Sequence, residues 1–156
     1  MPVSAVHTWL VLWRATRAVE ARAHRSIEGT GLCASDFAIL ETLLHKGPLP
    51  VSVIGRKVLL TTGSITTAVD RLVGRGLVAR KDDPADRRVR LVQLTARGRK
   101  LIEPAFATHG ADLERVMTVL TREERGTLVT LLRKLGRGAE ASGDTMDDAG
   151  DLEEST

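Results

Sequence analysis

Three common classes of protein need features that this 156-residue chain lacks. It has one cysteine, Cys33, so it cannot form an internal disulfide, and this suits a reducing cytoplasm. Its apolar runs are only a few residues long, too short to cross a bilayer, so we expect no membrane partner. The first 18 residues lack the basic start and the small-residue cleavage site of a signal peptide. The sequence therefore predicts a soluble, cytoplasmic protein.

Motifs of enzyme chemistry are also missing. Neither glycine-rich phosphate motif, G-x-x-x-x-G-K-[ST] or G-x-G-x-x-G, occurs in the sequence. No cluster with metal-ligand spacing and no Ser/His/Asp arrangement stands out. We therefore expect that the protein is not an enzyme, uses no cofactor and holds no metal.

Charge is distributed unevenly along the chain. Residues 139–156 hold seven acids and no lysine or arginine, which leaves residues 1–138 with a net charge of +10. Residues 56–100 alone hold 12 bases and four acids. A basic body concentrated in one segment is typical of proteins with a polyanion partner. A solvated basic face would give the same counts, so charge alone does not decide.

Helical periodicity predicts four helices in the first half of the chain. They cover residues 5–28, 36–45, 51–58 and 62–73. Ser35 is the expected cap of the second helix, and Thr62 that of the fourth. In the fourth helix the expected core side is Ile65, Val69, Leu72 and Val73. Glycines follow several of these segments and indicate where the helices end.

A β-hairpin is predicted after Gly76, with strands at residues 77–81 and 89–95. Its tip has the sequence Asp-Asp-Pro-Ala-Asp-Arg-Arg, which is too polar to be core. The chain then returns to helical periodicity over residues 96–120, where Pro104 should bend the helix. The fold class is therefore mainly α with a small β-hairpin wing.

The C-terminal part of the chain is predicted to be one more helix followed by a tail. Thr121 and Glu124 form a capping box ahead of a leucine-rich helix. From residue 138 the composition turns small and acidic, and we expect residues 138–156 to be disordered. The chain thus has six predicted helices, which with the hairpin gives a winged helix-turn-helix.

Wide apolar stripes on the terminal helices have no obvious local partner. They favour a homodimer built from both chain ends, although an intramolecular bundle is the alternative. The expected organisation is a helical dimerisation region at residues 5–34 and 104–137 around the winged helix-turn-helix lobe at residues 35–103, the part of the chain that would bind the polyanion.

Small polar side chains gather at the start of the fourth predicted helix. They are Thr62, Ser64, Thr66 and Thr67. Such side chains approach base edges closely and can touch a thymine methyl group, while the free N–H groups of the helix start suit a phosphate. Arg71, one turn beyond Thr67, can reach a phosphate or a guanine edge. The plain alternative is a solvent-facing polar surface.

The hairpin tip offers a second contact for DNA. Arg87 and Arg88 are planar cations on a projecting loop, which suits a narrow, electronegative minor groove. Asp86 can hold an arginine side chain or cap the tight turn. A salt-bridged turn in solvent is the alternative.

The segment from Ser35 to Ile102 resembles the multiple antibiotic resistance regulator (MarR) family of winged-helix regulators. The resemblance lies in L-x-x-x-G-L-V after the fourth helix, in D-R-R at the wing tip and in L-T-x-x-G after the second wing strand. It extends over about residues 5–137, including P-x-x-x-x-H and LTREERGTLVTLLRKLG. The segments L-L-H-K-G and L-L-T-T-G-S-I-T are most similar to the quinone-responsive MhqR-type branch.

The resemblance implies a sequence-specific homodimeric regulator, in most cases a repressor, on a pseudo-palindromic double-stranded operator. Arg88 would enter the minor groove and Asp86 would position the wing. Base reading would fall to Ser64, Thr66 and Thr67.

Family members commonly release DNA when a phenolic or other small effector binds. An effector that binds only the conformation unsuited to DNA would shift the population away from it. The candidate lining residues are Trp9, Trp13, His24, Phe37 and His45. For each of them core packing or a surface position is the alternative.

Other modes of action remain open at this point. Cys33 lies in a different context from the reactive cysteine of peroxide-sensing relatives, so an inert thiol is favoured over a thiol-responsive regulator. A zinc-responsive regulator would use residues such as Glu28, Cys33, His45 and His109, but Leu113 stands where a further histidine is needed. A non-specific architectural DNA-binding protein and a protein-binding winged helix are the remaining alternatives.

Overall fold

The computed structural model describes the backbone of residues 3–150 and divides the chain into two compact units. The first unit ends at Val116 and the second begins at Met117, and each is described by itself. Among the described helices, none combines the length and the hydropathy that crossing a bilayer requires.

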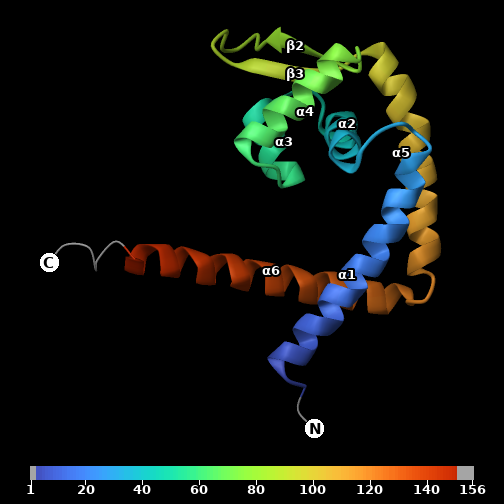
Figure 1. The fold of residues 1–156 in the computed structure, drawn as a ribbon, viewed down its shortest axis with the longest axis vertical. Helices are drawn as coiled ribbons and strands as arrows, with labels where there is room; N and C mark the ends of the chain where they lie inside the picture. The colour runs from blue at the N-terminus through green and yellow to red at the C-terminus, as the bar shows by residue number, and fades with distance from the viewer. Residues whose placement is uncertain (1–2, 151–156) are drawn as a thin grey trace, which may run out of the picture. The chain divides into compact units, whose positions relative to one another are not determined.

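Residues 3–150 form six helices and three short strands (Figure 1). The helices are α1 (Ala5–Glu28), α2 (Ala34–Lys46), α3 (Val51–Val58), α4 (Thr62–Gly74), α5 (Ala96–Met117) and α6 (Arg122–Gly150). The strands are β1 (Leu49–Pro50), β2 (Val78–Asp82) and β3 (Arg90–Leu94). The six helices and the hairpin confirm the predicted fold class.

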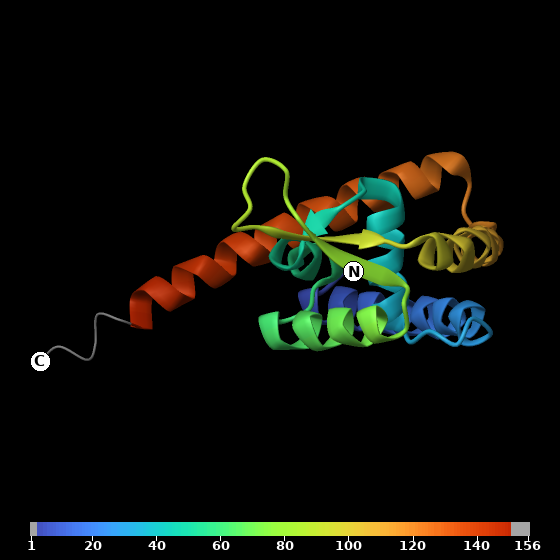
Figure 2. The same ribbon diagram turned by 90° about the horizontal axis from the view of Figure 1, so that it is seen from above.

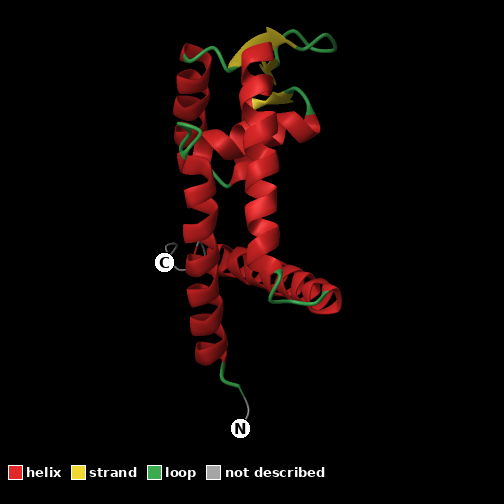
Figure 3. Ribbon diagram, turned by 90° about the vertical axis from the view of Figure 1, so that its right-hand side faces the viewer, coloured by secondary structure: helices red, strands yellow, loops and turns green. Residues whose placement is uncertain are grey.

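The strands form one antiparallel sheet with the order β1-β3-β2, drawn in yellow in Figure 3. Val78 lies opposite Leu94 and Asp82 lies opposite Arg90, which fixes the register of the wing. The edge strand β1 was not expected, because two residues beside a proline give no alternating pattern. Leu49 of β1 lies opposite Val92, which is fully buried.

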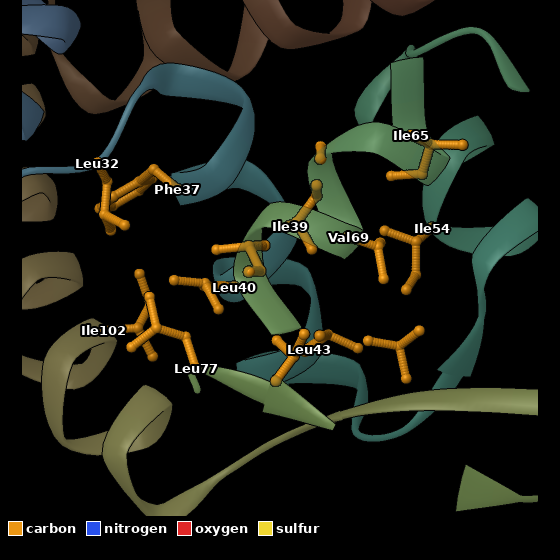
Figure 4. Packing of buried hydrophobic residues seen from close by; sticks show 14 of the residues in the cluster. Leu32, Phe37, Ile39, Leu40, Leu43, Ile54, Ile65, Val69, Leu77 and Ile102 are labelled. Carbon is orange, nitrogen blue, oxygen red and sulfur yellow. The ribbon is translucent and has the colours of Figure 1, made fainter. Parts of the chain in front are cut away.

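One apolar core lies in the first unit and joins α2, α3, α4, the wing and α5 (Figure 4). Its largest fully buried side chains include Leu40 and Leu43 of α2, Ile54 of α3, and Leu72 of α4. Ile102 of α5 is also fully buried. Because each such side chain stabilises the fold by about 1.5–3 kcal/mol, this core holds α4 firmly against its neighbours.

The structure corrects three details at the helix ends. Cys33 and not Ser35 occupies the N-cap position of α2, and its side chain makes no capping hydrogen bond. Thr61 and not Thr62 caps α4, since its hydroxyl accepts a hydrogen bond from the Ser64 N–H at 3.3 Å. Val73 is 37% exposed instead of buried. It lies about 80° around the helix from Ile65, outside the apolar stripe.

A close contact between the start of α5 and the segment just before β2 explains the L-T-x-x-G motif. The Thr95 hydroxyl donates to the carbonyl oxygen of Gly76 at 2.8 Å and accepts from the Gly98 N–H at 3.0 Å. Gly98 is buried, and a Cβ atom there would overlap the backbone carbonyl of Leu77. The first turn of α5 is therefore fixed against Gly76 and Leu77, which lie between α4 and β2.

The second unit is dominated by α6. The predicted capping box is present: the Thr121 N–H donates to Glu124 Oε2 at 2.8 Å, and the Glu124 N–H donates to Thr121 Oγ1 at 3.2 Å. The helix continues to Gly150, so the expected disorder is wrong for residues 138–150. A helix that has already nucleated adds residues at little cost, which polar composition alone does not reveal. Residues 151–156 lie outside the described part of the chain.

Candidate nucleic-acid interface

The first two turns of α4 present a row of exposed hydroxyl groups. Thr62, Ser64, Thr66 and Thr67 are all exposed, as the sequence predicts. The Thr66 hydroxyl donates to the Thr62 carbonyl oxygen at 2.9 Å, and the Thr67 hydroxyl donates to that of Gly63 at 3.1 Å. Each hydroxyl oxygen can still accept a hydrogen bond. This surface is therefore polar and rich in acceptors.

Arg71 has a partner within the protein that the sequence did not indicate. Its Nε donates to both carboxylate oxygens of Asp36, at 3.2 and 3.1 Å, and its Nη2 donates to Oδ1 at 2.5 Å. Asp36 is only 1% exposed, and these hydrogen bonds, together with its charge, raise the pKa of Arg71. The Arg71 side chain is still 44% exposed. Its first structural role is thus to bind α4 to α2, and contact with DNA stays a prediction.

Asp36 also contacts a second cation, which lies at the C-terminal end of α4. Arg75 Nη1 lies 3.6 Å from Asp36 Oδ2. One buried carboxylate therefore serves two guanidinium groups of α4, which satisfies the requirement that a buried charge be paired. The available signal in the sequence was an acid on the apolar side of α2, next to Phe37.

The wing tip is organised by its own aspartates. Asp86 Oδ1 accepts from the Arg88 N–H at 3.0 Å and from Arg88 Nε at 3.1 Å, and Asp86 Oδ2 accepts from Nη2 at 3.2 Å. These bonds from Arg88 lower the pKa of Asp86. Asp83 Oδ1 accepts from the Ala85 N–H at 2.8 Å and closes the turn. The Arg88 side chain is 92% exposed, so it is oriented by Asp86 and still accessible.

An ion pair links the wing to α4. Arg80 Nη2 on β2 lies 2.6 Å from Asp70 Oδ1 on α4. A second pair, Arg90 with Asp82 at 2.9 Å, joins the two wing strands. The sequence did not indicate either pair, since no local pattern links Asp70 to Arg80 or Asp82 to Arg90. These two pairs connect α4, which carries the hydroxyl row, to both strands of the wing.

The five candidate effector residues lie in different environments. Trp9, Trp13 and His24 are exposed on α1. Phe37 is buried in the core, and its ring centroid lies 5.0 Å from that of His109. The exposed His45 makes an edge contact with Phe106 at 4.6 Å.

His109 is a polar residue of the core whose partner the sequence did not indicate. Its Nδ1 lies 2.6 Å from Ser26 Oγ, which joins α5 to α1. In the described part of the chain no three His, Cys, Asp or Glu side chains group as metal ligands. Cys33 is exposed, with its Sγ 3.2 Å from Ser35 Oγ and 3.6 Å from Arg71 Nη2.

A winged helix that carries exposed small polar side chains on its fourth helix defines a class of DNA-binding transcription regulators. The sequence profile of the MarR family matches residues 32–89. The chain is 37% identical over 139 residues to the HTH-type transcriptional regulator MhqR of Bacillus subtilis (strain 168), covering 89% of this chain and 96% of that protein. The chain belongs to the MarR family of transcription regulators, which are non-enzymatic DNA-binding proteins.

Solved structures agree with this assignment. The Bordetella bronchiseptica regulator BpsR, described as regulated in its DNA binding by 6-hydroxynicotinic acid, is 28% identical with a TM-score of 0.75, covering 87% of this chain and 98% of that one. AbsC of Streptomyces coelicolor has a TM-score of 0.80 at 18% identity, covering 90% and 99% of the two chains, and shows the shared fold alone. The family resemblance drawn from the sequence is thereby confirmed.

Proposed function

We propose that the protein is a homodimeric repressor that binds a pseudo-palindromic operator and releases it when a small aromatic effector binds. The observation that carries this proposal is the exposed hydroxyl row of α4 beside a wing whose Arg88 is held by Asp86. A helix with small polar side chains fits the major groove, and an oriented guanidinium fits the minor groove next to it.

We assign base reading to Ser64, Thr66 and Thr67. Thr62, the first residue of α4, would face the phosphate backbone of the DNA. The oxygen atoms of these side chains accept hydrogen bonds from base amino groups, and the threonine methyl groups suit thymine. Arg87 and Arg88 supply cations at the wing. Arg71 contributes chiefly through Asp36, because that ion pair fixes the middle of α4.

Dimer formation is supported by apolar side chains that both terminal helices leave in solvent. In α1 they include Trp9 and Trp13, and in α6 the leucine stripe of Leu128, Leu131, Leu132 and Leu135. Apolar stripes that a helix leaves in solvent are typical of protein interfaces. A two-fold axis through this interface would present two copies of α4 to two half-sites one helical turn apart.

The effector part of the proposal rests on relatives. The DNA binding of BpsR is regulated by 6-hydroxynicotinic acid, an aromatic acid. Trp9, Trp13, His24 and His45 offer aromatic contacts on the helices that would surround the dimer axis. A thermal-shift series with phenols, quinones, aromatic acids and zinc would identify the class, and a shift with zinc alone would favour the metal-responsive alternative.

The DNA-binding mode can be tested with duplexes from the upstream region of the gene. Thr67→Ala should change the sequence preference, while Arg88→Ala should weaken binding to all duplexes and lower the salt slope by about one. Thr108→Ala and Arg22→Ala, at exposed positions of α5 and α1, are the matched controls.

Two results would contradict this function. Equal affinity of the wild type for every duplex, with a steep salt slope, would indicate an architectural DNA-binding protein. No binding to any duplex at low salt would indicate a winged helix that binds protein.

A further inference from the structure

A basic pocket lies at the end of α4 and has no part in the proposed DNA contacts. Its volume is about 320 Å³. The lining residues are Thr30, Arg75, Leu77, Arg97, Lys100 and Leu101. They come from the turn after α1, the end of α4, the start of the wing and the first turns of α5.

The charge of this pocket is of one sign. Three of its six lining residues are cations and none is an acid. Arg99, on the same helix but outside the pocket, pairs with Glu103 at 3.2 Å. Arg97 and Lys100 are exposed, and within the described residues neither has an ion pair or hydrogen bond. Two cations are thus available to an external partner.

The backbone that carries two of the pocket's cations is held firmly in place. The contact of Gly98 with the Leu77 carbonyl and the bonds of Thr95 fix the start of α5, which carries Arg97 in its first turn and Lys100 just after it. Leu77 is only 2% exposed and Leu101 is half-buried, so the wall between the cations is apolar. A ligand with an anionic head and an apolar body would match both parts of this lining.

The pocket lies away from the surfaces assigned to DNA. Figure 2 shows the wing loop and the start of α4 toward one end of the wing strands, and the end of α4 with the start of α5 toward the opposite end. An anion in this pocket is therefore better supplied by a small molecule than by the phosphate backbone of a duplex that contacts Ser64 and Arg88.

We propose that this pocket binds a small organic anion, whose carboxylate or phosphate lies between Arg75, Arg97 and Lys100 while its apolar part packs on Leu77 and Leu101. Arg75 is also a partner of Asp36, at 3.6 Å, and Asp36 binds Arg71 in the middle of α4. An anion that draws Arg75 toward the pocket removes one contact from Asp36 and loosens α4. This coupling rests on the proposed function, whereas anion binding does not.

Isothermal titration calorimetry on the DNA-free protein tests the site with benzoate and inorganic phosphate as probes and benzamide as the neutral control. Benzoate should bind saturably, and Arg97→Gln with Lys100→Gln should weaken it about tenfold or more, because two charge-assisted contacts are lost. Arg22→Gln with Arg99→Gln removes the same charge outside the pocket and should leave binding unchanged. Absence of saturable binding to the wild type, or equal binding by both double variants, would overturn the proposal.

A DNA titration separates the two sources of an anion. Benzoate should weaken duplex binding by the wild type about fivefold, in the usual range of coupling between sites, and should leave the Arg97/Lys100 variant unaffected. If that variant instead lowers the salt slope by about two, its cations contact DNA phosphates and the small-molecule site is refuted. A failure to find a preferred operator would count against the proposed function alone, since the calorimetry does not involve DNA.

Discussion

The DNA-binding lobe and the terminal helices treat their apolar side chains in opposite ways. In the lobe, Leu40 and Leu72 are fully buried among residues of the same chain. On the terminal helices, Trp9 is 60% exposed and Leu131 is 58% exposed. The lobe thus obtains its stability from its own sequence, whereas the terminal helices carry apolar surface that a second chain would cover. The predictions below test this contrast, from the largest expected effect to the smallest.

Gly98→Ala should cause the largest loss of stability. The added Cβ would meet the Leu77 backbone, which cannot move without shifting the sheet, so we expect about 3 kcal/mol less free energy of unfolding. Gly110→Ala on the same helix has open space around it and should raise stability by about 0.5–1 kcal/mol. Urea denaturation measures both variants. Similar denaturation midpoints for the two variants would show that the close contact between Gly98 and the Leu77 backbone does not contribute to stability.

Leu131→Lys should weaken the proposed dimer. Each buried leucine contributes about 1.5–3 kcal/mol, and a two-fold interface contains it twice, so the dissociation constant should rise by at least about 100-fold. Thr130→Lys places the same charge on the neighbouring exposed position of α6 and should have little effect. Analytical ultracentrifugation gives the dissociation constants. A wild type that remains monomeric at high concentration would remove the basis of the contrast.

Asp36→Asn should destabilise the lobe by about 1–2 kcal/mol, because Arg71 and Arg75 lose a buried charge but keep contact with water. Asp70→Asn breaks the exposed pair with Arg80 and should cost less than 1 kcal/mol, roughly the median for surface pairs. Duplex affinity should fall in the Asp36 variant if the pair positions α4. A stability loss without any change in DNA binding would limit Asp36 to a structural role.

Acidification should act on the start of α6, with the smallest effect. The backbone N–H and hydroxyl of Thr121 lower the pKa of Glu124 below its usual value of 4.5. A lowered pKa means that the cap stabilises the helix above this usual value and is lost as the pH falls through the lower folded value. Circular dichroism should show this loss in the wild type and not in Glu124→Gln, while Glu123→Gln should keep it. Identical acid profiles for all three would contradict the capping role.

The elements with strong local patterns were predictable, and the contacts between distant segments were not. Helical periodicity placed α1 and α3 correctly, and the capping box of Thr121 is present. The pair of Asp36 with Arg71 joins residues 35 positions apart, and no periodic pattern encodes it. Arg71 was therefore predicted as a free cation of the DNA surface. The end of α6 was mispredicted because composition says little about how far a formed helix extends.

The Asp86–Arg88 pair has a further consequence for how the protein finds its site. The wing tip from Asp82 to Arg88 carries three aspartates against two arginines, so its net charge is −1. Such a tip does not attract a polyanion from a distance, and the basic residues elsewhere must bring the protein to DNA. If Arg88 enters the minor groove as proposed, the groove competes with Asp86 for this side chain only after the protein has reached DNA. The wing would then bind only where the minor groove has a suitable shape, after the protein is already on DNA. On unsuitable DNA the wing would stay unbound, and the protein could move on along the duplex.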